Sequence, residues 1–498
     1  MEENLEEQIA LAWSPPVYDT GRVPHQLLSA QFPENTSGEP DAHNHTIFAR
    51  CPDGSAALAQ CEDRTFRFLQ LPPELLGITA DASKHAALPA SIMQPSPILD
   101  FAWYPSATIH DPASFCFVAS LRASYRIVDH RERQIAPHSL AFNVAASRLY
   151  CGFEDAIEVF DVHRPGEGTR LHITPSKKSR DGLKGAPARS QAEASLLTRA
   201  SAPGIVSALA FAPDVSSDLY AAGTLNPSAP TSSNIALFQE AAGEAPVMLV
   251  GAEDTHPAPG TGYGVRASVS QLAFNPARPY LLYASFRRTD TIYAWDLRGD
   301  VTRPVALYDK SAAPKGSAPA AKTKAKTQTN QRLRFDIDLG GTRLAVGDER
   351  GCISVFDLTE PETAADAGAR TPALQFHAHG DAVGSVAFHP LHPLALSVAG
   401  SRHFGGAAAA VREGDSDSSE DSDEDSDEDD GPDGDRMGRG KGSQVRAPSA
   451  RRLGRWGRSV PPRGGRGGVG ARIVRLPRRR RGPVALDASV KLWRFAHD

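Results

Sequence analysis

One short strand pattern recurs along most of the chain and limits the folds open to it. An apolar strand ends in an aromatic residue, one further residue and a proline in "LDFAWYP", "VSALAFAP", "VSQLAFNP" and "VGSVAFHP". Three looser copies, "TIFARCPDG", "HSLAFNVAAS" and "LRFDIDLGG", bring the number to seven. Most copies are followed by a strand of small residues and then by an alternating strand with an aromatic, such as "AIEVFDV" or "TIYAWDL". Strands that recur about every 40 to 60 residues, with almost no helical periodicity, predict a β-propeller.

The predicted fold is therefore all-β: a seven-bladed WD-repeat β-propeller, in which each repeat is one sheet packed on its neighbours. Alternation in a strand sends every second side chain into the core between blades. The recurring aromatics are large enough to fill the space that widens towards the rim, so we interpret them as core residues and not as a ligand cage.

The last repeat is divided by a long insertion. Seven first strands occur, but only five third strands precede residue 404, and "DASVKLWRF" at 487–495 has the alternation of the missing one. Between them, an acidic run at 413–435 precedes an arginine- and glycine-rich run, and neither contains enough apolar residues to offset the entropy of ordering. We therefore expect a disordered insertion at 405–486 within the last blade.

The predicted domain organisation follows from this insertion. It comprises a flexible amino-terminal segment at 1–24, propeller strands at 25–404, the insertion, and a returning last-blade strand at 487–498. A propeller must close its ring, and "HQLLSAQF" at 25–32 is the candidate strand that completes the final blade.

The second repeat is incomplete. After "FCFVAS", Ser120 runs directly into "LRASYRIVDHRERQIAPHS", and no aromatic third strand precedes the next repeat. The alternatives are a segment missing from the gene model and a blade that has repacked.

Composition excludes several classes of protein. The chain has five cysteines, an odd number, and they are scattered without a C-x-x-C pair, which favours neither a disulfide framework nor a cysteine zinc site. The first residues are acidic and lack an apolar signal core, and no stretch approaches the roughly 20 apolar residues of a membrane helix. These features predict a soluble intracellular protein in a reducing compartment, with no membrane partner.

Several longer strings resemble a known family. "CPDGSAALAQCEDRTFRFLQLPPELL", "APHSLAFN", "RLYCGFEDAIEVFDVHRPG" and "TNQRLRFDIDLGGTRLAVGDERGCISVFD" are similar to the telomerase Cajal body protein family of WD-repeat propellers. The resemblance covers roughly 40–404 and 487–495, and "LPPELL" and "TNQR" are its most particular parts. Two features depart from the family: the missing strand after Ser120 and the arginine-rich part of the insertion, some of which could be translated intron.

The resemblance implies a non-catalytic scaffold in a nuclear, Cajal body-like location. Such a scaffold binds small nuclear RNAs through a Cajal-body localisation box in their terminal loop, and telomerase RNA in some organisms. The implied protein partners are those of box H/ACA-type ribonucleoproteins, together with telomerase. A propeller that only bridges proteins, without contacting RNA itself, is the alternative function, because the fold serves many roles.

Two short motifs have metal-ligand spacing but a simpler explanation. "HAHGD" contains His377, His379 and Asp381, and "DAHNH" contains Asp41, His43 and His45. A histidine-glycine pair before a first strand is a common structural element of WD repeats, so we expect no metal and no cofactor. No serine, cysteine or histidine lies in a nucleophile motif, and "GRGKGS" lacks the context of a phosphate loop, so we do not expect an enzyme.

Basic residues on expected propeller loops are the candidate RNA contacts. RNA loops are read by stacking on aromatic or guanidinium planes and by contacts to base edges, while basic side chains hold phosphates. Each of these residues could instead be a solvated surface charge. The candidates are Arg122, Arg126, His130, Arg131 and Arg133 after the second blade, Arg287 and Arg288 in the fifth, and Asn330, Gln331 and Arg332 before the sixth.

The insertion has possible roles of its own. "RGGRGG" is typical of flexible RNA-binding segments and "LPRRRRG" of nuclear import signals, although the run could also simply offset the adjacent acids. Ser418, Ser422 and Ser426 each have an acidic residue three positions later, the pattern of an acid-directed kinase site.

Overall fold

The structure is a computed structural model of the 498-residue chain. It describes residues 14–31, 47–71, 90–122, 135–172, 204–251, 265–312, 330–359, 369–401 and 485–495, apart from 155, 165, 167, 215, 226–232, 245 and 266. The predicted insertion at 405–486 lies outside these ranges except for its last two residues, so its disorder stays a prediction. Residues 1–408 and 481–498 group into one compact unit, which holds every described strand.

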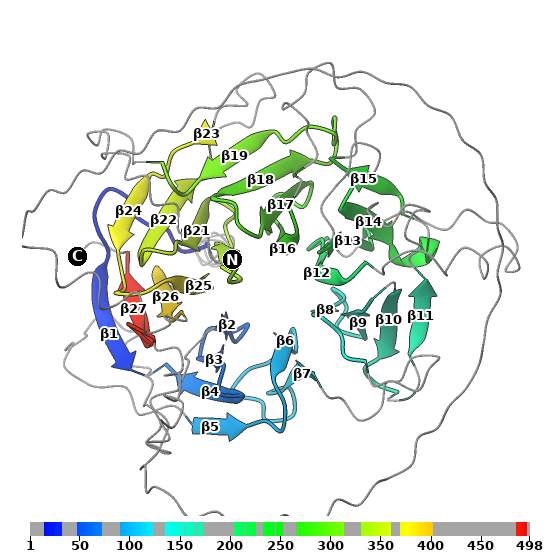
Figure 1. Cartoon of the computed structure of the whole chain (residues 1–498), viewed down its shortest axis with the longest axis horizontal. Coiled ribbons are helices and arrows are strands. Elements are labelled where there is room, and N and C mark those ends of the chain that lie inside the picture. Colours follow the sequence, from blue (N-terminus) through cyan, green and yellow to red (C-terminus); the bar gives the residue numbers. More distant parts are fainter. Residues whose placement is uncertain are drawn as a thin grey trace, which may run out of the picture. The chain divides into compact units, whose positions relative to one another are not determined.

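The described residues form an all-β propeller, with sheets arranged around a common axis (Figure 1). Strands follow one another outwards from the axis in antiparallel order, and the described part contains a single short helix, η1 (Glu240–Ala242). The first three four-stranded sheets are β2 (Ile47–Arg50), β3 (Ala56–Gln60), β4 (Thr65–Gln70) and β5 (Ala90–Met93); β8 (Ser139–Phe142), β9 (Arg148–Gly152), β10 (Ala156–Asp161) and β11 (Thr169–His172); and β12 (Val206–Phe211), β13 (Leu219–Thr224), β14 (Ile235–Gln239) and β15 (Met248–Val250).

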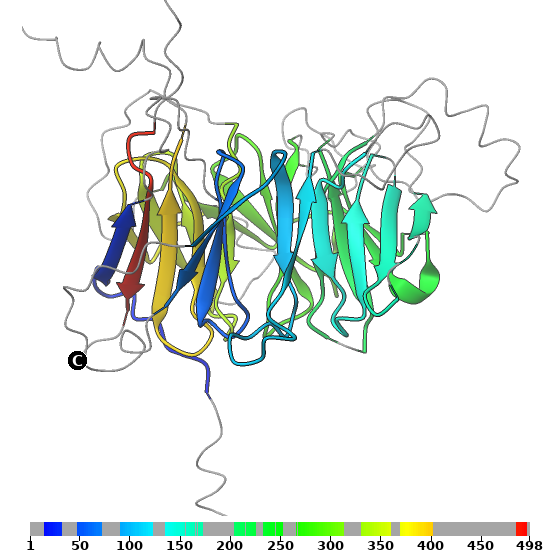
Figure 2. The same cartoon turned by 90° about the horizontal axis from the view of Figure 1, so that it is seen from below.

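The next sheet gains a fifth strand. It contains β16 (Val269–Phe274), β17 (Leu281–Phe286), β18 (Thr291–Asp296) and β19 (Ala306–Asp309), and β23 (Ala369–Arg370) pairs with β19 in parallel. The remaining four-stranded sheets are β20 (Phe335–Ile337), β21 (Arg343–Gly347), β22 (Cys352–Asp357) and β24 (Leu374–His377), and the last sheet, β25 (Val383–Phe388), β26 (Leu394–Ala399), β27 (Ser489–Arg494) and β1 (His25–Gln31). Figure 2 views the ring from the side, with the strands running between its two ends.

The predicted number of seven blades is not confirmed. Six sheets have four or five strands, whereas the place after the first sheet holds only β6 (Ile98–Trp103) and β7 (Phe117–Leu121) (Figure 1). This is where the sequence lacks an aromatic third strand, and within the described residues β7 pairs only with β6. The structure thus contains six detected blades and a two-stranded sheet.

The last sheet joins three distant parts of the chain. β27 pairs antiparallel with β26 on one side and with β1 on the other, so Val490 lies opposite both Val398 and Ala30. Val490 and Leu492 are each 1% exposed, which shows that the alternation of "SVKLWR" reflects burial on the faces of a sheet. The chain therefore returns from the insertion to a middle position of this sheet and not to its edge.

A hydrogen-bonded group of polar side chains fixes this return. The two ring nitrogens of His379 lie 3.0 Å from Ser489 Oγ and 2.7 Å from Ser397 Oγ, and Trp493 Nε1 donates to the same Ser397 oxygen at 2.8 Å. Asp487 Oδ2 lies 3.6 Å from the His379 ring and accepts from the Gly380 amide at 2.8 Å. Burial lowers the pKa of His379, so the ring is neutral near pH 7 and its two nitrogens serve one as donor and one as acceptor.

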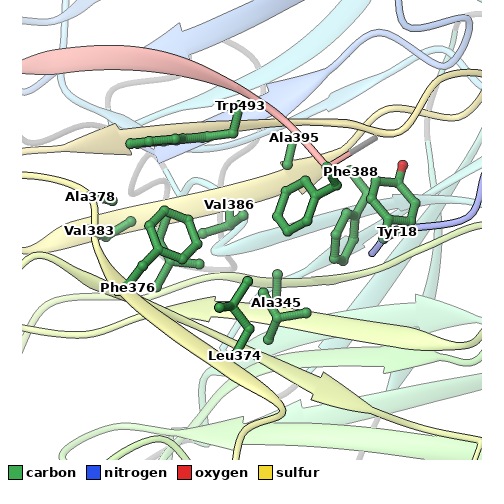
Figure 3. Close-up of a cluster of buried hydrophobic side chains, with 13 residues drawn as sticks. Tyr18, Ala345, Leu374, Phe376, Ala378, Val383, Val386, Phe388, Ala395 and Trp493 are labelled. Atoms are coloured by element: carbon green, nitrogen blue, oxygen red, sulfur yellow. The ribbon is translucent and has the colours of Figure 1, made fainter. Parts of the chain in front are cut away.

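The amino-terminal approach to β1 is packed as well. Tyr18 lies in the predicted flexible segment 1–24, yet it is 1% exposed, and its hydroxyl donates to the carbonyl of His389 at 2.6 Å. Its ring lies 4.5 Å from that of Phe388 and 5.6 Å from that of Phe495, centroid to centroid, within the buried cluster in Figure 3. This part of the segment is therefore ordered by its contacts with the last sheet.

The recurring aromatics line the core as predicted. Most of those in first and third strands are less than a tenth exposed, while Phe68, Phe142, Phe160 and Phe211 are partly buried. The buried members are Trp103, Phe238, Phe274, Trp295, Phe356, Phe388 and Trp493. No cage of exposed rings forms among them, because each packs on neighbouring sheets.

Candidate RNA-binding surface

The starts of the innermost strands lie together at one end of the ring. We call this end the entry face. Hydrogen bonds join the starts of neighbouring innermost strands: Leu140 N to Asp100 Oδ2, Ser139 Oγ to Val206 O, Ser207 Oγ to Val269 O, Phe335 N to Gln271 Oε1, and Arg334 N to Gly384 O. These contacts hold the first strands of different sheets in a fixed relation around the axis.

The pairing register of the strands places the described candidate RNA contacts at the entry face. Phe286 pairs with Val269 and Leu121 with Ile98, so the residues that follow β17 and β7 lie beside the starts of β16 and β6. Arg122, Arg287 and Arg288 occupy those positions, and two residues separate 330–332 from the start of β20 at Phe335. Of the predicted contacts, Arg126, His130, Arg131 and Arg133 lie outside the described residues.

The side chain of Arg332, three residues before the start of β20, contacts residues of other sheets. Its Nη2 donates to Ser207 O at 2.7 Å and lies 3.5 Å from His138 O, while its Nη1 lies 4.0 Å from Asp100 Oδ1. The side chain is only 14% exposed. Burial lowers the pKa of Arg332 to about 10, with Arg334 and Arg287 adding to the effect and Asp100 opposing it. Arg332 is therefore an internal tie between sheets as well as a candidate contact.

Sequence reasoning missed two charged residues of the same group. Arg334 Nη2 donates to Asp100 Oδ1, and Asp100 Oδ2 accepts from the Leu140 amide at 3.0 Å. The sequence did distinguish Asp100. Five residues before the proline, the other three close copies of the repeat have alanine, glutamine or serine, and only this copy has a charged residue. Arg334 is two residues after Arg332, which in an extended chain places both side chains on one side.

Arg287 completes this group. It is partly buried, burial lowers its pKa, and its charge acts on Arg332. Among the described residues, its guanidinium has no hydrogen-bond or ion-pair partner. We call Arg287, Arg332 and Arg334, together with Asp100, the central arginine cluster.

Arg288 and Gln331 belong to a neighbouring cavity. Arg288 is exposed with a φ of 60°, and it lines a cavity with Gln331, Lys310 and Glu349. Gln331 Nε2 also donates to Gly400 O at 2.5 Å, and Asn330 is exposed. Arg287 therefore belongs with Arg332 in the central arginine cluster, whereas Arg288 and Gln331 line the neighbouring cavity.

Arg122 is separate from both places. It is exposed at the end of β7, where its amide donates to Pro97 O at 2.9 Å. No contact between described residues joins its side chain to the central arginine cluster.

The motifs with metal spacing do not converge on a site. His379 is used in the serine contacts of the last sheet, and Asp41, His43 and His45 lie outside the described residues. In the part of the chain that the structure describes, no group of three or more histidine, cysteine or acidic residues could hold a metal ion, and no helix is long and apolar enough to cross a membrane.

Comparison with curated proteins shows what this sequence is similar to. No family model matches the chain. Among curated proteins, Telomerase Cajal body protein 1 of Mesocricetus auratus is 27% identical over 397 residues, covering 75% of this chain, and that of Homo sapiens is 26% identical over 412 residues, covering 78%. These alignments confirm the predicted resemblance to the telomerase Cajal body proteins over most of the chain. The Drosophila melanogaster homolog matches more distantly, at 23% identity over 376 residues.

The telomerase Cajal body proteins that match are longer than the matched part. The alignments take in 62% of the hamster protein, 64% of the human protein and 56% of the fly homolog. The match therefore spans less than two thirds of each of these relatives.

Proposed function

We propose that the chain is a non-catalytic scaffold that binds RNA through its entry face. Its RNA would be a small nuclear RNA with a Cajal-body localisation box, with telomerase RNA a further ligand, and its location would be the nuclear Cajal body. Box H/ACA-type ribonucleoprotein proteins and telomerase are the proposed partners. Two observations support this: the names of the relatives, and the arginines that the fold gathers at one face.

The central arginine cluster is the observation that carries the proposal. Guanidinium groups bond phosphates and base edges and stack on bases, and they do so more strongly where water is partly excluded. The guanidinium of Arg287 in particular has no hydrogen-bond partner among the described residues, so it can donate to a ligand. A platform that bridges proteins would need no such group, and it is the competing function that the experiment below separates.

The test compares loop variants with deletion of the arginine- and glycine-rich tract, 436–481. Arg287→Glu/Arg288→Glu is expected to weaken binding of a cognate RNA loop at least tenfold and to reduce discrimination against a scrambled loop, because base contacts are lost along with phosphate contacts. The loss of discrimination should persist at raised salt. Tract deletion should instead weaken both RNAs alike and in a strongly salt-dependent way. Titrations of both RNAs at two salt concentrations measure these effects.

Arg298→Glu is the matched control, because Arg298 is 61% exposed and bonds only locally with Asp296 and Tyr280. It should bind RNA nearly as the unchanged protein does. If the double variant keeps its discrimination while tract deletion abolishes all binding, the propeller is a protein-bridging platform. Crosslinking in cells followed by RNA sequencing should enrich RNAs that share one loop box.

We also propose that β6 and β7 are the inner half of a seventh blade. In each of the six larger sheets, the third strand carries an alternating apolar pattern. Among the described sheets, the sheet of β6 and β7 lacks such a third strand. Sequencing of the transcript across the Ser120–Leu121 junction is expected to reveal a coding segment for an aromatic-bearing strand. A contiguous transcript in every tissue would show that the blade is truly incomplete.

A further inference from the structure

The central arginine cluster holds more positive than negative charge. The guanidinium groups of Arg332 and Arg334 lie at the carboxylate of Asp100, and Arg287 is a third positive charge that acts on Arg332. Asp100 is the one carboxylate that opposes the effect of burial on Arg332, whereas the other two arginines repel it. His138 is also close, but burial lowers its pKa and Arg332 adds to the lowering, so it stays neutral. Glu154 acts on His138 and is not among the charges that act on Arg332.

Part of the hydrogen-bonding capacity of the cluster is also unused. The Nε atoms of Arg287 and Arg332 are buried, and neither has a hydrogen-bond partner among the described residues. Arg332 places its Nη2 on the Ser207 carbonyl, and Arg334 places its Nη2 on Asp100. Arg287 has no such contact. Donors that are withdrawn from water and left unpaired cost free energy, and an acceptor placed among them recovers it.

We propose that the central arginine cluster binds one phosphate oxyanion. A phosphate offers several acceptor oxygens around one centre, and the planar fork of a guanidinium matches two of them at once. Its negative charge offsets part or all of the excess of two positive charges, which a neutral base or a peptide amide does not. The anion has two possible sources, an RNA backbone phosphate or a small polyphosphate, and the first of these rests on the proposed RNA function.

Asp100 positions the cluster without neutralising it. Through its two oxygens it ties Arg334 to the Leu140 amide of a different sheet, and it lies 4.0 Å from Arg332. Arg334 and Arg332 are thereby fixed before the anion arrives. Prior ordering of donors lowers the entropy cost of binding.

Arg287→Gln is the variant of choice for the test, because this change removes a guanidinium without breaking a described contact of its side chain. Its melting temperature without ligand should equal that of the unchanged protein. Inorganic pyrophosphate, compared with chloride at equal ionic strength, is expected to raise the melting temperature of the unchanged protein, since a ligand that binds only the native state stabilises it. Calorimetric titration of pyrophosphate should show about tenfold weaker binding to Arg287→Gln, the effect of one lost charge-assisted hydrogen bond.

Arg298→Gln serves as the control, since this exposed arginine lies outside the cluster and should leave pyrophosphate affinity unchanged. A second arm titrates the cognate RNA with and without pyrophosphate. Competition, together with an equal loss in Arg287→Gln, assigns the site to an RNA phosphate. Binding of pyrophosphate to a protein that binds no RNA assigns it to a small polyphosphate and refutes the proposed RNA function alone. Equal pyrophosphate affinity in the two glutamine variants, or no binding at all, would overturn the oxyanion site.

Discussion

Removal of residues 485–498 is expected to unfold the propeller, whereas removal of 410–484 should leave it folded. The carboxyl-terminal segment contributes Val490, Leu492, Trp493 and Phe495, each no more than 6% exposed. Loss of one such side chain costs about 2–5 kcal/mol, and the four together reach the whole stability of a typical domain, about 5–15 kcal/mol. The truncation also separates β1 from β26 and removes three partners of His379 and Ser397.

Thermal melts followed by circular dichroism would compare the two truncations. Point variants provide a matched pair: Leu492→Ala should lose about 2–5 kcal/mol, and Leu486→Ala, at a position 64% exposed, should stay within about 0.5 kcal/mol. Equal melting temperatures for the two truncations would refute the role of β27 as a structural strand.

Replacement of Asp100 by alanine is expected to destabilise the propeller by about 2–3 kcal/mol. The change leaves Arg334 and Arg332 facing Arg287 without a carboxylate, and it leaves the Leu140 amide without its acceptor. Breaking a fully buried pair costs about 3–5 kcal/mol, and the loss here is smaller because the Arg334 side chain is 24% exposed. Urea unfolding measures the difference.

Asp100→Asn should lie between the unchanged protein and the alanine variant, because the amide keeps one acceptor oxygen. Asp214→Ala is the control, since Asp214 is only partly buried and, among the described residues, bonds within its own turn to Ser216 and Ser217. If Asp100→Ala unfolds at the same urea concentration as Asp214→Ala, the cluster does not tie the sheets together.

Much of the fold was accessible from the pattern of residues. The alternation of "SVKLWR" and the shortage of third strands predicted a strand that returns after the insertion, and β27 pairs in the last sheet. The prediction of His379 as a structural histidine rested on its glycine neighbour, and the ring does bond within the last sheet. The number of blades was less secure, because it counted a second repeat in which β7 has no third strand beside it in the described part.

The candidate site was less accessible. The sequence offers Arg287 and Arg332 as candidate RNA contacts on exposed loops, but Arg332 is largely buried and bonds a carbonyl of another sheet. Arg334 and Asp100 were passed over, because each looks like an ordinary alternating strand residue. Their contact joins positions 234 residues apart, and no local pattern reports on so distant a pair.

The residue pattern alone predicts which segments become strands and how they stack, because the period of two and the turn residues are local properties of the chain. It also determined that distant ends must meet, since a lone strand with one apolar face is unstable until a sheet covers it. Which charged side chains lie together depends instead on the folded ring. Ring closure brings the starts of innermost strands together around the axis, and it is this convergence, not any single loop, that sets Arg287, Arg332 and Arg334 against Asp100.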